Sequence, residues 1–258
     1  MVFEASAVSE NRKKIINIYM ENVHRKKPET EEFTRSHDGK EGHWLEKQMG
    51  IVPNSANMPD LLGHEMKSDT TSKTTFGDWS ANYYIFTDDN YNITRDEFLK
   101  IFGHPSPEVE GRYSWSGEPT PKIGKVNSFG QELVIDERNN IGARYSYSND
   151  TRENKSSIVP TYLQKDNLTI ARWDAESLKS KLENKFNQMG WFKCLKNKDG
   201  AYDEIVFGDP INFETFIGYV ATGEIFFDSG MYTGNPRPYS QWRANNSLWE
   251  KLVVSRHT

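Results

Sequence analysis

The sequence has very little cysteine and no long hydrophobic run. Cys194 is the single cysteine among 258 residues, which excludes an intramolecular disulfide and a zinc site built from several cysteines. No run of ~18 apolar residues is present, the length that a membrane-spanning helix needs, and the first residues lack the apolar segment of a signal peptide. These absences predict a soluble intracellular protein that contacts no membrane.

The sequence motifs of two common enzyme classes are also missing. Residues 121–125 (PKIGK) lack the glycine spacing of a G-x-x-x-x-G-K-[ST] loop, which cradles phosphates. No G-x-S-x-G sequence marks the nucleophile of an α/β-hydrolase. We therefore expect neither a P-loop enzyme nor a serine hydrolase of this type, and no small-molecule cofactor.

Aromatic residues are plentiful and the chain is slightly acidic. The 14 Phe, 12 Tyr and 7 Trp can each bury a large area, so we expect a hydrophobic core. Lys and Arg number 32 against 37 Asp and Glu, a formal net charge of −5. This balance does not exclude nucleic-acid binding, because a local basic surface is sufficient. Basic clusters at residues 12–14 and 25–27 either contact phosphates or are simply solvated.

The order of the expected elements indicates a mixed fold. Apolar residues at helical spacing predict helices over residues 9–24, 43–50, 175–189 and 213–222. Strands are predicted over residues 58–68, 81–87, 132–136, 143–147, 168–173, 200–208 and 224–228. Because this order is not a regular βαβ series, we predict an α/β (α+β) fold with a mixed β-sheet flanked by helices.

The strongest candidate for a functional site lies in the stretch PDLLGHEMK. On a strand, Glu65 and Lys67 point to the same face, because side chains alternate. Asp60 is on the wrong face by simple alternation, so it joins them only if Gly63 supports a bulge or bend. Two carboxylates and a main-chain carbonyl, here that of Met66, are suitable Mg²⁺ ligands, and metal-assisted phosphodiester hydrolysis also needs a nearby positive group.

The short pattern alone leaves another interpretation open. A solvated strand edge with a surface Glu–Lys pair has the same sequence, and a protein-interaction domain could carry it by chance. His64 beside a carboxylate suggests a metal ligand, but a packed histidine is the simpler interpretation. The neighbouring sequence is needed to choose between these alternatives.

Upstream, residues 38–51 (DGKEGHWLEKQMGI) resemble the G-x-x-L-E helix that precedes the catalytic strand in MutH-like and MvaI/BcnI-type restriction endonucleases. In those PD-(D/E)xK enzymes a helix glutamate is followed by an aspartate and then by Glu-x-Lys. Glu46, Asp60, Glu65 and Lys67 occur here in the same order. The specific similarity covers about residues 36–80, with fainter support over residues 205–252.

The resemblance implies a PD-(D/E)xK nuclease core in a bilobal protein with a DNA-binding cleft. It implies a type II restriction endonuclease that hydrolyses double-stranded DNA at a short palindromic or pseudopalindromic site, as a monomer that nicks the strands in turn. A MutH-like strand-nicking repair endonuclease and a catalytically inactive DNA-binding protein are the alternatives. The Pro- and Gly-rich residues 103–125 are the best candidate for the connection between lobes. Residues 1–105 would then be mainly catalytic and residues 106–258 mainly DNA-reading, with interleaving allowed.

The same resemblance assigns roles to the catalytic candidates. Asp60 and Glu65 would bind Mg²⁺, with Mn²⁺ or Ca²⁺ able to occupy the site, and the carbonyl of Met66 would be an extra ligand. Lys67 would orient the attacking water and screen the charge that develops on the phosphate. Glu46 would support a second metal ion or hold Lys67.

A Gly- and Pro-rich segment at residues 228–243 is predicted to be a long loop that reads DNA. Arginine can bond guanine edges bidentately, and asparagine or glutamine can bond adenine. Related enzymes often have a histidine-containing stretch here, whereas this chain has PRPY at residues 236–239, so no target sequence is inferred. The predicted DNA-binding residues are Lys73, Asn235, Arg237, Tyr239, Gln241 and Arg243.

The expected partner is double-stranded DNA, and a cognate DNA methyltransferase belongs to such a system without direct contact. The expected location is the cytoplasm of a bacterial or archaeal cell.

Overall fold

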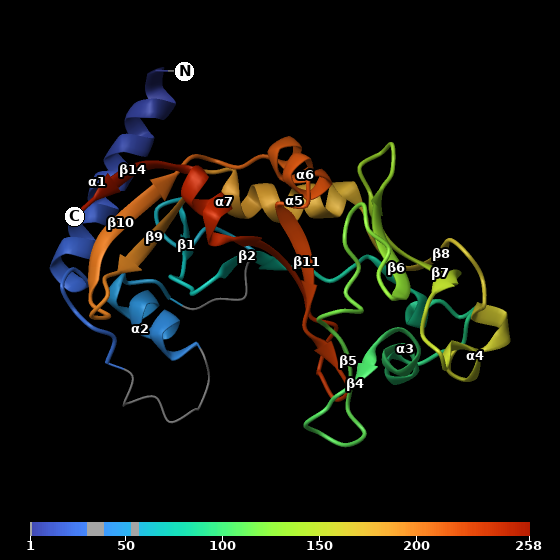
Figure 1. Cartoon of the computed structure of the whole chain (residues 1–258). Coiled ribbons are helices and arrows are strands. Elements are labelled where there is room, and N and C mark those ends of the chain that lie inside the picture. The colour runs from blue at the N-terminus through green and yellow to red at the C-terminus, as the bar shows by residue number, and fades with distance from the viewer. Residues whose placement is uncertain (1, 30–38, 53–56) are drawn as a thin grey trace. The chain divides into compact units, whose positions relative to one another are not determined.

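A computed structural model describes residues 2–29, 39–52 and 57–258 of the chain (Figure 1). The chain forms two compact units that interleave along the sequence. The first unit comprises Met1–Thr74, Lys181–Asn212 and Asn246–Thr258, and the second comprises Thr75–Ser180 and Phe213–Asn245. Residues 103–125 lie inside the second unit, so the division does not fall at this Pro- and Gly-rich stretch.

The first unit is built on a four-stranded mixed sheet in the order β1-β9-β10-β14. The strands are β1 (Glu65–Lys67), β9 (Trp191–Lys196), β10 (Tyr202–Gly208) and β14 (Val253–His257). β1 runs parallel to β9, and the other neighbours are antiparallel. The β9–β10 turn forms because the Asn197 side chain accepts hydrogen bonds from the main-chain N–H groups of Asp199 and Ala201, and Gly200 takes a φ of +83°.

One face of this sheet is covered by two helices, α1 (Val2–Asn22) and α2 (Lys40–Gln48). The predicted helical spacing puts the buried side chains of α1 and α2 on one stripe each. The indole of Trp44 stacks on the ring of Tyr202 at 5.9 Å between centroids. The core on this face consists of Ile15, Tyr19, Val23, Trp44, Leu45, Met49, Ile51, Met66, Phe192, Cys194, Tyr202, Ile205 and Phe207.

Helices α5 (Ala175–Phe186) and α7 (Asn246–Lys251) place aromatic side chains near Trp191, the first residue of β9. The Trp249 ring lies 4.9 Å from that of Trp191 and 6.2 Å from that of Phe186. Because Trp191 pairs with Glu65 in the β1–β9 register, these rings pack beside the strand that carries the predicted catalytic residues. Glu65 and Lys67 therefore lie close to aromatic side chains.

The second unit contains three sheets and an aromatic core. Phe98, Trp115 and Phe227 pack in succession, with centroid distances of 5.1 and 5.3 Å, and Trp173 packs against Trp242 at 5.4 Å. The sheet orders are β3-β8-β7-β6, β11-β13-β2 and β12-β5-β4. The strands are β2 (Lys73–Asp78), β3 (Tyr83–Tyr84), β4 (His104–Pro105), β5 (Tyr113–Trp115), β6 (Phe129–Ile135), β7 (Ile141–Asp150), β8 (Leu168–Trp173), β11 (Ile225–Ser229), β12 (Met231–Tyr232) and β13 (Ser240–Asn245). Its helices are α3 (Arg95–Phe102), α4 (Lys155–Ile158), α6 (Phe213–Ala221) and the 3₁₀ turns η1 (Ile85–Thr87) and η2 (Thr161–Leu163).

Three expected elements differ from the structure. The strand expected over residues 81–87 ends after Tyr84, because the Thr87 hydroxyl donates to the Tyr84 carbonyl and closes the turn η1. The strand expected over residues 58–68 is confined to Glu65–Lys67. The long loop expected at residues 228–243 is interrupted by β12 and ends at Ser240, where β13 begins. No helix within the described ranges is long and apolar enough to cross a membrane.

Candidate active site

A tight hairpin returns Asp60 to the side of β1. Leu61 and His64 exchange two main-chain hydrogen bonds of 3.0 and 2.8 Å. Leu62 and Gly63, the two residues of the turn, have φ values of +48° and +78°, as a two-residue primed turn requires. The Oδ2 atom of Asp60 then accepts a 2.9 Å hydrogen bond from the Met66 N–H group. This turn provides the bend that the spacing of Asp60 and Glu65 demands.

Glu65 and Lys67 lie on the same face of β1, as strand alternation predicts. Nζ of Lys67 is 2.8 Å from Oε1 of Glu65, and Nζ of Lys185, from the last turn of α5, is 3.1 Å from the same oxygen. Glu65 is 2% exposed and Lys67 is 5% exposed. The other oxygen, Oε2 of Glu65, is buried without a hydrogen-bond partner among the described residues.

Burial shifts the pKa values of two of these groups. Burial, followed by the negative charge of Glu65, raises the pKa of Asp60 to about 6. Burial lowers the pKa of Lys67, against the attraction of Glu65. Ionisable groups with opposing shifts at one place are typical of active sites, although structural ion pairs produce them too.

The neighbouring strand β9 adds a buried lysine, Lys193, which was not among the residues expected from the sequence. Lys193 is the register partner of Lys67, is 4% exposed and donates a 3.2 Å hydrogen bond to the Thr74 hydroxyl. Burial lowers its pKa to about 8, while Asp69 opposes the shift. The signal in the sequence is a lysine inside the otherwise apolar run WFKCL. Lys185 gave no comparable signal, because it is one of several lysines on an amphipathic helix.

The oxygen donors of this site suit a hard divalent cation. Asp60 and Glu65 provide carboxylates, and the unpartnered Oε2 of Glu65 is the kind of atom that a metal ion would satisfy. Within the described ranges there is no group of three or more His, Cys, Asp and Glu side chains that could hold a metal ion. Main-chain carbonyl, water and phosphate oxygens would therefore have to complete the coordination shell of an Mg²⁺ ion, as is usual for this ion.

Two nearby candidates lie apart from this cluster. His64 is completely buried, and its ring packs edge-on against Phe207 in the core, so the structure favours the packed interpretation. Burial lowers its pKa to about 4. Glu46 lies on α2, where Oε2 is 3.3 Å from Nδ1 of His43 and the side chain is 35% exposed. Its role toward Lys67 or a second metal ion stays a prediction.

The predicted DNA-reading residues of the second unit are divided between a turn and a strand. Asn235 is 2% exposed, and its side-chain oxygen accepts the Tyr232 N–H group, so it stabilises the turn. Arg237 is exposed, donates to Asp78 at 2.7 Å and has its guanidinium 4.4 Å from the centre of the Tyr239 ring.

Gln241 and Arg243 are strand residues rather than loop residues. In the β11–β13 register Gln241 is opposite Asp228 and Arg243 is opposite Phe226. The Arg243 guanidinium donates to Asp228 at 3.0 Å. Lys73 is at the start of β2, in the first unit, and is partly buried. Whether these residues contact DNA stays a prediction.

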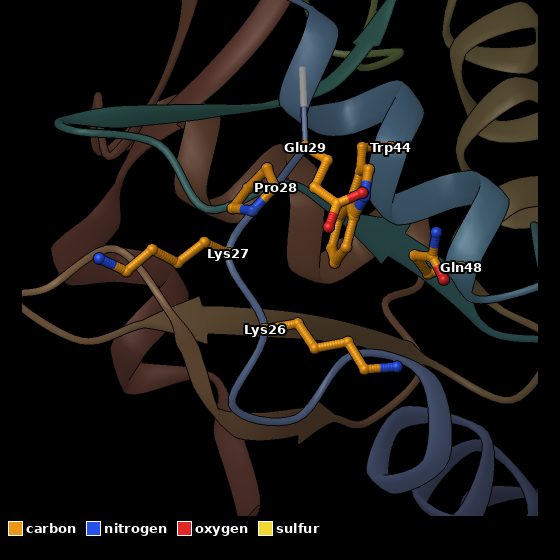
Figure 2. Close-up of a pocket in the computed structure, with 6 residues that line it drawn as sticks. All are labelled: Lys26, Lys27, Pro28, Glu29, Trp44 and Gln48. Atoms are coloured by element: carbon orange, nitrogen blue, oxygen red, sulfur yellow. The ribbon is translucent and has the colours of Figure 1, made fainter. Parts of the chain in front are cut away.

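A surface pocket of about 510 Å³ lies beside α2 (Figure 2). It is lined by Lys26, Lys27, Pro28, Glu29, Trp44 and Gln48. Figure 2 shows that the side chains of Lys26 and Lys27 extend in opposite directions from their segment. Their ammonium groups therefore do not converge on one anion, and this pocket gives no support for a phosphate site at residues 25–27.

Comparison with known proteins shows the family of the chain. The family model of the LlaMI restriction endonuclease matches residues 23–257. The type II restriction enzyme ScrFI of Lactococcus lactis subsp. cremoris is 47% identical over 267 aligned residues, which cover 96% of this chain and 98% of the relative. The complex of restriction endonuclease MvaI with its cognate DNA substrate matches with a TM-score of 0.56 and 12% identity and covers 97% of both chains.

The structural likeness, at this low identity, concerns the fold alone. It confirms the expected mixed α+β fold of the PD-(D/E)xK type. The family model and the 47%-identical relative both span nearly the whole chain and confirm the resemblance noted in the sequence. The chain thus belongs to the LlaMI restriction endonuclease family and is a type II restriction endonuclease.

Proposed function

We propose that this endonuclease cuts double-stranded DNA with Mg²⁺ as its metal ion, held by Asp60, Glu65 and the main-chain carbonyl of Met66. The observation that carries the proposal is the unpartnered Oε2 of Glu65, buried beside Lys67. A buried carboxylate oxygen without a partner costs free energy, and a hard cation removes that cost. Mn²⁺ and Ca²⁺ fit the same oxygen donors.

Each side chain has a separate task in the proposed reaction. The metal ion, when bound, supplies Lewis acidity and a bound water of lowered pKa. Lys67 orients the attacking water and offsets the charge that develops on the scissile phosphate, for which its position beside Glu65 is suitable. Asp60 acts as a ligand when ionised, so its raised pKa makes metal binding dependent on pH. Glu46 would support a second ion.

For recognition, we propose that the segment 235–243 and Lys73 contact the DNA. Exposed Arg237 and the strand residues Gln241 and Arg243 offer donors for base edges or phosphates, and Tyr239 supports Arg237 by stacking. Asn235 would act through the turn that it stabilises. The target would be a short palindromic or pseudopalindromic sequence.

A single active site per chain raises the question of how both strands are cut. We propose a monomer that nicks one strand and then the other. A cognate methyltransferase would protect host DNA, with both proteins in the cytoplasm. Under this scheme, open-circular plasmid accumulates before linear product, and the rate of each nick is proportional to enzyme concentration.

Digestion of a sequenced plasmid, with Mg²⁺ or with EDTA, tests the catalytic assignment. We expect discrete Mg²⁺-dependent fragments from the wild type. Asp60→Asn, Glu65→Gln and Lys67→Met should each reduce the cleavage rate by about 10³-fold or more, because each removes a ligand or a charge-stabilising group. End sequencing of the fragments gives the target.

Lys198→Met and Asp199→Asn are matched controls. Both residues are exposed in the β9–β10 turn of the same unit, and we expect wild-type cleavage from both variants. Cleavage that survives the three active-site substitutions would show that the catalytic residues lie elsewhere. Equal loss in the control variants would show that the assay reports folding rather than catalysis.

A further inference from the structure

Two lysines, Lys67 and Lys185, lie close to the same oxygen of Glu65, although one cation would be enough to balance the charge of the carboxylate. Lys67 alone gives this buried carboxylate a cation at 2.8 Å, and Lys185 adds a second at 3.1 Å. The two differ in exposure, since the side chain of Lys67 is 6% exposed and that of Lys185 is 22% exposed. Lys185 therefore has a route to solvent, which Lys67 lacks.

The backbone of Lys185 is firmly placed. The next residue, Phe186, is completely buried, and its carbonyl accepts the Ile211 N–H group. The Phe186 ring also lies 4.9 Å from Nζ of Lys67. Because the end of α5 is fixed in this way, the ammonium of Lys185 is held near Glu65 by the fold and moves only through its own flexible stem.

We propose that Lys185 is a displaceable counter-ion of Glu65 that opposes metal binding there. This inference rests on the proposed role of Glu65 as a metal ligand. Two ammonium groups on a ligand oxygen repel a divalent cation at the same carboxylate, and the burial of Glu65 limits the screening of this repulsion by water. Withdrawal of Lys185 into solvent, or its pairing with a DNA phosphate, relieves that repulsion. Metal binding is thereby linked to the presence of substrate.

The test is calorimetric titration of the DNA-free, full-length protein with Ca²⁺ alone, which needs no catalysis. Lys185→Gln should bind Ca²⁺ about tenfold more tightly than the wild type, because one repelling charge is removed. Lys185→Arg keeps the charge and should bind like the wild type. Lys179→Gln, on the exposed part of the same helix, is the matched control and should also bind like the wild type. Thermal unfolding of each variant checks that it is folded.

Glu65→Gln separates this inference from the function on which it rests. If Glu65→Gln retains wild-type Ca²⁺ binding, Glu65 is not the ligand and the proposed metal site is wrong. If Glu65→Gln loses binding but Lys185→Gln binds no more tightly than the wild type, only the counter-ion role is overturned. Failure of both the wild type and Lys185→Gln to bind Ca²⁺ detectably would overturn that role as well.

Discussion

Glu65 of the hairpin at residues 60–67 and Arg237 of the segment at residues 235–243 differ in burial and in pairing. In the hairpin, Glu65 is almost fully buried and keeps one oxygen without a partner in the described structure. In the segment, Arg237 is half exposed and is paired with Asp78.

This difference matters for the two ligands proposed, a metal ion at Glu65 and DNA at the segment 235–243. A buried, unpartnered carboxylate oxygen costs free energy, and under the proposed function a bound cation would remove that cost. Ion pairs at exposed side chains contribute little to stability, so Arg237 could exchange Asp78 for DNA at a small cost. The three predictions that follow test this comparison.

The largest effect on stability is expected from Gly63→Ala, which breaks the hairpin. Gly63 has a φ of +78°, and an added Cβ would lie 2.7 Å from Cγ of Met189. The left-handed backbone and the overpacking together should lower the free energy of unfolding by about 3 kcal/mol. Urea unfolding measures this loss. Cleavage should fall as well, because the turn that positions Asp60 is disturbed.

Gly200→Ala is the control for backbone strain alone. Gly200 has a φ of +83°, yet an added Cβ would meet no atom within 4 Å. We expect a loss of about 1 kcal/mol, from the left-handed conformation, with wild-type cleavage. Equal losses in the two variants would mean that the contact with Met189 contributes nothing and that the hairpin is less tightly fixed than its geometry indicates.

A smaller effect on stability is expected in the segment 235–243, where Asn235 and Arg237 should respond differently to substitution. Asn235→Ala removes the buried acceptor of the Tyr232 N–H group and should lower the free energy of unfolding by about 1–2 kcal/mol. Arg237→Ala should change stability by less than about 0.5 kcal/mol, because the arginine side chain is half exposed.

The loss of DNA affinity should be larger for Arg237→Ala than for Asn235→Ala, the reverse of the order expected for stability. Arg237→Ala should weaken binding in a salt-dependent way, as expected for an arginine that contacts phosphate or base. Electrophoretic mobility shifts at two salt concentrations, with Ca²⁺ in place of Mg²⁺, measure the change. Unchanged DNA binding by Arg237→Ala would remove this arginine from the proposed interface.

The bend at Gly63 and the shared face of Glu65 and Lys67 could be predicted from the sequence because they are local, although a strand over residues 58–68 was expected rather than a hairpin. Strand alternation puts Glu65 and Lys67 together, and the spacing of Asp60 requires the bend that Leu62 and Gly63 form. The helices around residues 9–24 and 43–50 follow from apolar periodicity in the same way. Each of these features depends on residues a few positions apart.

The remainder depends on contacts between distant parts of the chain. Lys193 reaches the site through the pairing of β1 with a strand more than a hundred residues later, and Lys185 reaches it from α5, neither of which a local pattern encodes. Asn235 is of a residue type that can read DNA and lies in a Gly- and Pro-rich segment, but tertiary packing buries it. Gln241 and Arg243 follow a Gly- and Pro-rich run, yet pairing with β11 makes them strand residues. Interleaving of the two units likewise follows from long-range packing.

The smallest of the three effects on stability is expected at Asp60, whose ionisation in the folded protein costs free energy when no metal ion is bound. Its pKa is about 6 in the folded protein, against 3.8 ordinarily, chiefly through burial and the charge of Glu65. A carboxyl with a raised pKa favours the folded state while it is protonated, and that contribution is lost as the pH rises. The full shift corresponds to ~3 kcal/mol, which solvent screening at this partly exposed group reduces to about 1 kcal/mol.

Asp60→Asn removes this ionisation and keeps an oxygen that can accept the Met66 N–H group. In EDTA, the variant and the wild type should unfold at similar urea concentrations near pH 4. The variant should become the more stable protein between about pH 4 and pH 6, with a constant difference above that range, because the wild type loses its contribution there. Asp199→Asn, in the exposed β9–β10 turn, should show no such pH-dependent difference in stability from the wild type. A wild type that is at least as stable as Asp60→Asn at pH 8 would mean that Asp60 is stabilised as an anion without metal, so that the hairpin is not organised for a cation.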